Sequence, residues 1–213
     1  MTLSRYTTIP AMLDALLHQH LVLVNPAYWT DRNDREVMEA FTASRPTSRV
    51  FAACLAEGNE TAHHWQVFAD TGKGACIRFD RQRLIAAVEA AGALHGPISY
   101  VNWRDLSGAQ HLGDRLAFLK RSVFRFEREY RIIAVSEDCS APVLNVPVPL
   151  SAITSIYISG EIPPSLFSSI SSIVRSIPGC RQLRVRHSGL LRNENWSRSF
   201  ENLLSSHARP ALP

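Results

Sequence analysis

Apolar residues at the start of the chain recur first at strand and then at helix spacing. The segment LSRYTT, residues 3–8, is short enough for an opening strand. In IPAMLDALLHQH, residues 9–20, apolar side chains fall three and four positions apart, which predicts an amphipathic helix. Thr8 suits its N-cap and Pro10 its first turn. The apolar run LVLVN then predicts a short strand that Pro26 closes.

Strands and helices continue to alternate to the end of the chain. The pattern predicts further strands at 49–57, 75–80, 96–103, 126–135, 142–150, 153–160 and 180–188. It predicts helices from near Arg35 and at 61–70, 81–92, 105–125 and 163–177. Short strands with charged faces and proline breaks favour an α+β domain with an antiparallel or mixed sheet and flanking helices. A doubly wound parallel sheet would have almost uniformly apolar strands.

Length and composition indicate one ordinary globular domain. A chain of 213 residues can bury one sizeable core, so we expect a single domain over 1–203 and a flexible tail over 204–213. The formal charge of +4 permits an anionic partner such as a dinucleotide or nucleic acid. It does not single one out, because the sequence has no long run of Lys and Arg.

Cysteine spacing and the N-terminal segment bear on metal binding and location. Cys54, Cys76, Cys139 and Cys180 are far apart and form no CxxC pair, which argues against a thiolate zinc site. The first residues carry no basic segment followed by a long apolar core, and the sequence has no apolar run of membrane-spanning length. We therefore expect no signal peptide, no membrane association and a cytoplasmic location.

Short polar motifs offer little catalytic chemistry. The sequence contains no GxGxxG, Walker phosphate loop, HExxH or GxSxG. The GKG of residues 72–74 precedes a strand, whereas a phosphate loop follows one, so it favours a tight turn. The acids of WTDRND, residues 29–34, lack the glycine and terminal glutamate of a calcium loop, which favours helix capping.

The motif HHW, residues 63–65, leaves two interpretations open. Adjacent histidines on a helix point about 100° apart and cannot easily share one ion, so we expect no metal site. Trp65 and Phe68, three positions apart, share a helix face. They are either part of the core or an aromatic wall on which a ring stacks.

The stretch FEREYRIIAV, residues 126–135, raises the main question. In a strand, Glu127, Glu129 and Arg131 point to one side and Phe126 and Tyr130 to the other. A solvated outer face explains such charges. A cleft lined by acid and base explains them as well.

The motifs together resemble the DUF2971 family of uncharacterised bacterial proteins. The resemblance rests, in chain order, on LSRYTT, WTDRND, AACLAE, HHWQVFAD, GKGACIRFD and FRFEREYRII, and spans about residues 3–160. The sequence departs from the family in having Leu55 where a phenylalanine follows the cysteine. It also has Asn-Asp-Arg where many members have Asn-Asp-Pro.

A second resemblance, at the level of the fold, is to ADP-ribosyltransferases. The REY of residues 128–130 is similar to the NEY that precedes an apolar run in poly-ADP-ribose polymerases. The resemblance implies NAD as substrate and Glu129 as the acid at the ribose. It also implies that Glu127 completes an E-x-E pair and receives the acceptor's proton.

The same resemblance implies further ligand-binding residues and partners. Arg5 and Arg131 would hold ribose hydroxyls or pyrophosphate, and Tyr6, Trp65 or Phe68 would stack on nicotinamide. The acceptor would be a protein or a nucleic acid, or NAD would be hydrolysed. A toxin or phage-defence role, with an antitoxin or defence-system partner, belongs to the same expectation. It requires the strands at 3–7 and 127–133 to lie in one sheet region.

Two other function classes stay open on sequence. In a non-enzymatic ligand-sensing or interaction domain, Glu127, Glu129 and Arg131 would form structural ion pairs. In a metal-dependent nuclease, Asp31, Asp34 and Glu129 would gather around an ion. Nicotinamide release separates the transferase from both, and metal-dependent cleavage of nucleic acid identifies the nuclease.

Overall fold

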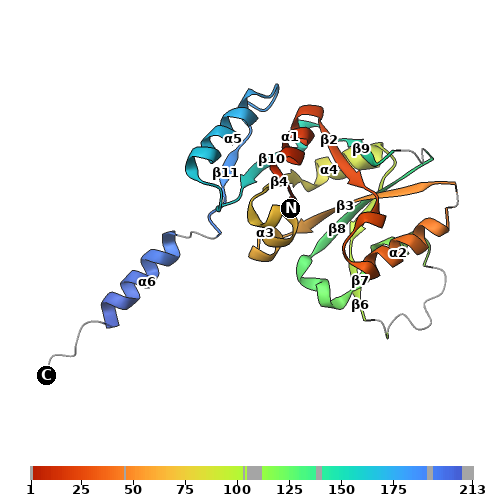
Figure 1. Cartoon of the computed structure of the whole chain (residues 1–213), viewed down its shortest axis with the longest axis horizontal. Coiled ribbons are helices and arrows are strands. Elements are labelled where there is room, and N and C mark those ends of the chain that lie inside the picture. Colours follow the sequence, from red (N-terminus) through yellow and green to blue (C-terminus); the bar gives the residue numbers. More distant parts are fainter. Residues whose placement is uncertain are drawn as a thin grey trace.

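A computed structural model describes residues 2–45, 47–102, 104, 112–137, 141–190 and 194–207. Helices and antiparallel and parallel strand pairs occur in one α+β domain, which confirms the predicted fold class (Figure 1). The α-helices are α1 (Ile9–His18), α2 (Arg32–Ala43), α3 (Ala62–Phe68), α4 (Arg81–Ala90), α5 (Pro164–Ser176) and α6 (Glu194–His207). The 3-10 helices are η1 (Pro26–Tyr28), η2 (Asp70–Gly72), η4 (Gly113–Phe118), η5 (Ser122–Glu127) and η6 (Leu150–Ala152).

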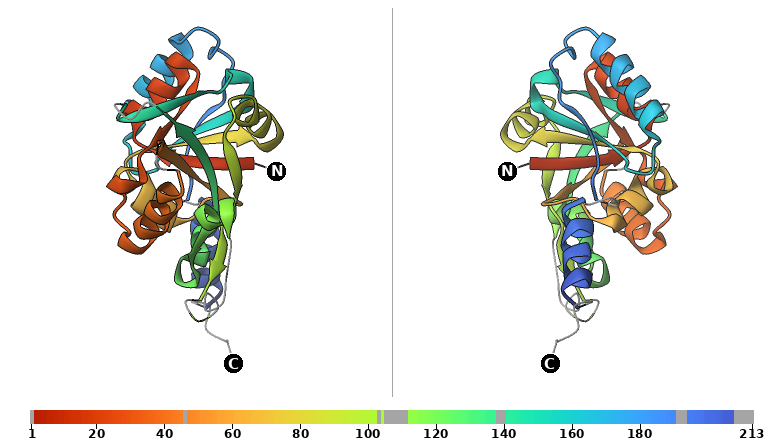
Figure 2. Two further views of the ribbon diagram at one scale, coloured as in Figure 1. Left: turned by 90° about the vertical axis from the view of Figure 1, so that its right-hand side faces the viewer. Right: turned by 90° about the vertical axis from the view of Figure 1, so that its left-hand side faces the viewer.

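The strands form one large mixed sheet and one small sheet. The large sheet comprises β1 (Thr2–Thr7), β2 (His20–Val24), β3 (Arg49–Glu57), β4 (Ala75–Asp80), β5 (Leu94–Pro97), β8 (Glu129–Ser136), β9 (Val143–Pro147), β10 (Ile153–Ile158) and β11 (Val185–His187). Its order is β11-β10-β4-β1-β3-β2-β9, and β8 pairs with β3 and β5. The small sheet pairs β6 (Ser99–Val101) with β7 (Leu119–Arg121) and lies at the lower end of the domain in Figures 1 and 2.

The large sheet parts between β1 and β3. These strands pair at only two positions, Leu3 with Glu57 and Ser4 with Ala56. In contrast, β1 pairs with β4 along its whole length and β3 pairs with β8 over eight positions. Strand β1 therefore separates from β3 after Ser4. We call the place where Arg5 and the following residues of β1 no longer pair with β3 the split.

Alternation along β3 divides the core between the two sheet faces. Phe51, Ala53 and Leu55 belong to the main core cluster, which α1, α4 and α5 cover. Ala52 packs with Met38 and Phe41 of α2 in a second cluster. Ala56, on the same face of β3 as Ala52, packs under Trp65 of α3 in a third cluster. The α2 and α3 side of the sheet is the one that carries the candidate site.

Side-chain caps set the starts of three helices. Thr8 Oγ1 accepts a hydrogen bond from Ala11 N, as predicted for α1. Asp31 caps α2, which therefore begins at Arg32, three residues earlier than predicted. Thr61 caps α3 through His64 N.

Several predicted elements differ in the structure. The strand predicted from residue 126 begins at Glu129, because η5 precedes it and Arg128 has a φ of 45°. The helix predicted over 105–125 is wrong where the structure describes it, since η4, β7 and η5 stand there instead. Residues 105–111 of that prediction lie outside the described residues.

Shorter differences occur elsewhere in the chain. The strand predicted over 96–103 is divided between β5 and β6, and the one predicted over 180–188 is reduced to β11. Helix α6 stands away from the sheet and reaches His207, beyond residue 203, so the boundary between domain and tail stays a prediction (Figure 1). Within the described residues, no helix has the length and apolar character that a membrane crossing requires.

Candidate active site

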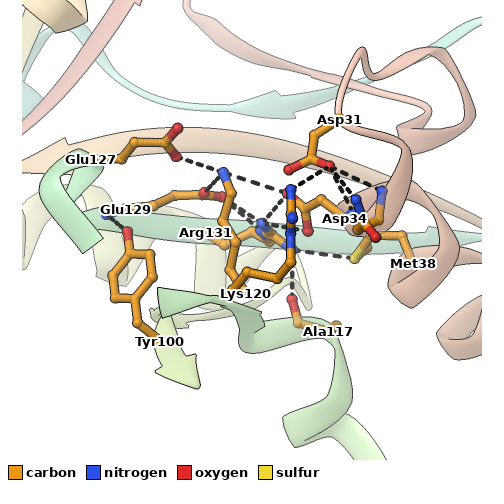
Figure 3. A network of polar contacts seen from close by, with 11 residues as sticks. Asp31, Asp34, Met38, Tyr100, Ala117, Lys120, Glu127, Glu129 and Arg131 are labelled. Carbon is orange, nitrogen blue, oxygen red and sulfur yellow. Dashed lines mark hydrogen bonds and ion pairs between the residues drawn. The ribbon is translucent and has the colours of Figure 1, made fainter. Parts of the chain in front are cut away.

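The charged row of β8 faces protein, not solvent. The side chains of Glu129 and Arg131 are only 4% and 0% exposed. They lie between α2 on one side and β6, β7 and η5 on the other (Figure 3). The interpretation of FEREYR as a solvated face is therefore wrong for these two residues, and their charges must be balanced inside the protein.

Arg131 is the centre of the network. Its Nε donates to Glu129 Oε1 at 2.8 Å, and its Nη2 donates to both Asp34 oxygens at 3.1 and 2.9 Å. Its Nη1 donates to the Ala117 carbonyl at 2.9 Å, and the Trp29 ring lies 4.8 Å from the guanidinium carbon. The guanidinium thus bridges α2, β8 and the end of η4, and is held in one orientation (Figure 3).

Lys120 of β7 joins the second acid to the first. Its Nζ lies 2.5 Å from Glu127 Oε2, 2.9 Å from Glu129 Oε2 and 3.6 Å from Asp34 Oδ2. The Glu129 backbone N–H also donates to the Tyr100 hydroxyl of β6 at 2.7 Å. The small sheet therefore covers the acids and supplies a cation to them.

Two cations balance three carboxylates, and the carboxylates respond differently. Burial acts to raise the pKa of Glu129, but Arg131 and Lys120 outweigh it and lower that pKa to about 2. Burial raises the pKa of Glu127 and of Asp34. Glu129 is therefore the fixed anion of the network, and Glu127 is a carboxyl that binds a proton more readily.

Arg5 and Tyr6 lie at the split, next to this network. Ser4 pairs with Ala56 and Ala56 pairs with Glu129, so β1 and β8 are about 10 Å apart on either side of β3. Arg5 Nη1 donates to the Cys54 carbonyl at 2.7 Å. Burial lowers the pKa of Arg5 and the Glu129 carboxylate acts to raise it. The predicted placement of the two strands in one sheet region is confirmed.

Helix α3 packs against the split through His64 and Trp65, which contact Tyr6 of β1. Burial lowers the pKa of His64, whose neutral ring donates from Nε2 to the Glu127 carbonyl at 2.9 Å. The Tyr6 ring stacks on His64 at 5.1 Å and meets Trp65 edge-on at 5.4 Å. Trp65 is 2% exposed and its indole N–H donates to Glu60. Of the two interpretations of HHW, the structure favours the core for Trp65, because its buried ring packs behind Tyr6 and has no free face on which a ligand could stack.

Phe68 differs from Trp65 in its surroundings. It is 39% exposed and its ring contacts those of His63 and His64. Phe126, also exposed, contacts His63 edge-on at 4.5 Å. An exposed aromatic edge therefore runs beside Glu127, outside the buried Tyr6 and Trp65 pair.

The sequence-based site residues thus gather in two groups. One, formed by Glu127, Glu129 and Arg131, is linked by ion pairs. The other is formed by Tyr6, Trp65 and Phe68: the rings of Tyr6 and Phe68 contact His64, and Trp65 packs edge-on against Tyr6. Arg5 lies between them, and His64 joins them through the Glu127 carbonyl.

Three members of the network had no role in the sequence-based site. The sequence pattern places Lys120 inside a predicted helix and Tyr100 inside a predicted strand, and it marks Asp34 only as a helix-capping or metal-binding acid. The one local signal for Lys120 is its position seven residues before Glu127. Nothing local marks Asp34 as the partner of Arg131, which is 97 residues away along the chain.

The acids proposed for a nuclease do not share an ion site in this arrangement. Asp34 and Glu129 both bind the Arg131 guanidinium, and Asp31 Oδ1 caps α2. Among the described residues, the group with metal-ligand geometry is Asp14, His18 and His20, on other elements. The nuclease interpretation therefore has no geometric support here.

Known proteins offer only distant likeness. No family model matches the sequence, so membership of DUF2971 stays a prediction. No curated protein matches it either. Among solved structures, DarT of Thermus sp. 2.9 in complex with NAD+ has a TM-score of 0.40 and 11% identity, covering 88% of this chain and 94% of that one. The same protein in complex with ADP-ribosylated ssDNA has a TM-score of 0.42 and 14% identity, covering 88% and 93%. At such values, nothing about activity passes from that protein to this chain.

Proposed function

We propose that the protein transfers ADP-ribose from NAD to a protein or nucleic-acid acceptor, or to water. The observation that carries this proposal is the difference in pKa between two carboxylates, Glu127 and Glu129, that contact the same lysine. The pKa of Glu129 is lowered to about 2 and that of Glu127 is raised. Neighbouring acids whose pKa values are pushed apart are suited to different roles in one reaction.

Glu129 has the properties of an electrostatic stabiliser. The bond between ribose C1′ and nicotinamide breaks, and nicotinamide leaves with the electron pair. The ribose then carries positive charge, which a fixed carboxylate stabilises without reorganisation. Arg131 holds Glu129 in one orientation, so the carboxylate does not need to reorient when the ribose binds.

Glu127 has the properties of a proton acceptor. The acceptor's nucleophile, or water, forms the new bond to C1′ and must lose a proton. The raised pKa of Glu127 makes its carboxylate a better base than that of Glu129. His64 fixes the Glu127 backbone from α3, and the aromatic edge of Phe68 and Phe126 lies beside it for a ring to stack on.

Lys120 must move for this chemistry to occur. Its ammonium bridges both carboxylates, where the positively charged ribose would bind. Strand β7 pairs with β6 in the small sheet, separately from the large sheet. In the proposed reaction, NAD displaces Lys120 from Glu129 without breaking a strand pair of the large sheet.

A specific observation also favours the non-enzymatic alternative. Glu127 and Glu129 are buried and ion-paired in the structure, which is also what a purely structural network requires. In a ligand-sensing or interaction domain the same residues would hold the small sheet against α2. Loss of Glu129 would then change stability and no reaction rate.

Nicotinamide release from NAD by the purified protein, with and without acceptor-containing lysate, tests the proposal. Glu129→Gln keeps the size of the side chain and removes its charge, so the rate should fall by about 10²–10³-fold. Glu127→Gln should impair transfer to an acceptor more than hydrolysis of NAD.

The matched control is Glu36→Gln, which removes an exposed acid of α2 and should leave the rate unchanged. Equal rates for wild type and Glu129→Gln, with both proteins folded, would contradict the transferase proposal. A wild type that releases no nicotinamide under either condition, but loses stability in Glu129→Gln, would favour the structural role.

A further inference from the structure

A second cluster of polar side chains lies where α1 ends and β2 begins. Asp14 and His18 are one helical turn apart on α1. Gln19 caps the helix in the left-handed conformation, with φ 51° and ψ 51°, so the chain turns at once into β2. The turn places the His20 ring, the first of β2, stacked on the His18 ring at 5.4 Å.

One carboxylate faces both imidazoles. Asp14 Oδ1 lies 3.0 Å from His18 Nδ1, and Asp14 Oδ2 lies 2.7 Å from His20 Nε2. One ligand atom from each of the three residues lies within 4.8 Å of the others. Two imidazole nitrogens and a carboxylate oxygen therefore converge on one small volume.

We propose that Asp14, His18 and His20 bind a divalent transition-metal ion of the zinc type. Imidazole nitrogen with carboxylate oxygen suits Zn²⁺ and its neighbours, whereas Mg²⁺ and Ca²⁺ prefer oxygen alone. The Asp14 carboxylate supplies negative charge, which attracts a cation. The site is separate from the Glu129 network and does not depend on the proposed transferase activity.

The geometry needs only a small adjustment to hold an ion. With ligand bonds of about 2.1 Å, tetrahedral ligand atoms lie about 3.4 Å apart. His20 is held in place, with its side chain 13% exposed, whereas that of His18 is 61% exposed and has room to rotate. Rotation of His18 closes the site around the ion, and water completes the coordination.

Ion binding would replace hydrogen bonds that the cluster makes without metal. His18 Nδ1 also lies 3.2 Å from the Asp14 carbonyl, a contact that requires a proton on this nitrogen. A metal takes the unprotonated nitrogen, so binding releases a proton or selects the other tautomer. The bound ion would fasten the last turn of α1 to the first residue of β2.

The test titrates protein without an affinity tag with Zn²⁺ by calorimetry, and with Co²⁺ by visible absorption. We expect one Zn²⁺ ion per chain and the absorption of a low-symmetry nitrogen and oxygen site with Co²⁺. His20→Ala and the more conservative Asp14→Asn should each weaken Zn²⁺ binding at least 10-fold. Mg²⁺ and Ca²⁺ should give no comparable heat.

The matched control is His95→Ala. His95 also contacts a carboxylate, Glu89, at 3.0 Å, but among the described residues no second imidazole joins that pair to form a three-ligand group. Its removal should leave Zn²⁺ affinity unchanged. Equal affinity in wild type and Asp14→Asn, with both proteins folded by circular dichroism, would overturn the proposal. Loss of binding in His95→Ala instead would also overturn it.

Discussion

The network around Arg131 and the cluster of Asp14, His18 and His20, here called the corner, both combine carboxylates with basic side chains, but they differ in burial. At the network, three carboxylates and two cations are buried under the small sheet. At the corner, one carboxylate meets two imidazoles near the surface. Burial makes the first set costly to disturb and shifts its pKa values, whereas water screens the second. The comparison indicates that the buried charges of the network are held in fixed positions, whereas the side chains at the corner can rearrange around a ligand.

The largest expected effect comes from removing the buried cation. Arg131→Met leaves Asp34 and Glu129 without their shared guanidinium. We expect a loss of about 3–5 kcal/mol in the free energy of unfolding, measured with urea, because a buried charge is left uncompensated. The matched variant Arg32→Met breaks an exposed pair with Glu36 and should cost less than about 0.5 kcal/mol. Similar losses of unfolding free energy in Arg131→Met and Arg32→Met would contradict the claim that burial makes the network costly to disturb.

Acid should weaken the network in a defined range of pH. The folded-state pKa of Glu129, about 2, lies below its ordinary value. A depressed carboxyl contributes stability that is complete above the unfolded pKa of about 4.3 and lost as pH falls toward the folded value. The shift corresponds to about 3 kcal/mol, at about 1.4 kcal/mol for each pKa unit.

Urea unfolding of wild type and Glu129→Gln between pH 3 and 6 checks this expectation. The wild type should lose its advantage over the variant as pH falls below about 4.3. A difference in unfolding free energy that stays constant over this range would show that the Glu129 carboxylate is not held ionised by its neighbours.

The smallest effect is expected at the corner. Without metal, Asp14→Asn should change the free energy of unfolding by less than about 0.5 kcal/mol, because the Asp14 side chain is 44% exposed and water screens its contacts with the two histidines. With Zn²⁺ present, the melting temperature of the wild type should rise and that of Asp14→Asn should not. A large loss without metal would show that the corner is a structural ion pair and that the contrast with the network is wrong.

Local pattern predicted the parts of the fold that local chemistry determines. The Thr8 cap and the apolar face of α1 follow from spacing and capping groups. Alternation also placed Glu129 and Arg131 on one face of β8 correctly. It could not tell whether that face meets water or protein, because the covering segments come from elsewhere in the chain.

The errors lie where tertiary contacts override local preference. The segment predicted as a helix at 105–125 instead contains η4 and β7, which deliver the Ala117 carbonyl and Lys120 to Arg131 and the acids. Arg128 adopts a positive φ and starts β8 at Glu129. The side chains of His18 and His20 meet only because Gln19 turns the chain, which hydrophobic periodicity does not report.

The central claim is that the pKa values of Glu127 and Glu129 differ, because burial raises that of Glu127 whereas Arg131 and Lys120 lower that of Glu129. The most direct measurement is a carboxyl ¹³C NMR titration of glutamate-labelled protein, assigned with Glu127→Gln and Glu129→Gln. The account predicts that Glu129 titrates near 2, or stays ionised until the protein unfolds, and that Glu127 titrates above the ordinary value of about 4.3. Two midpoints close to 4.3, or Glu129 titrating above Glu127, would contradict it.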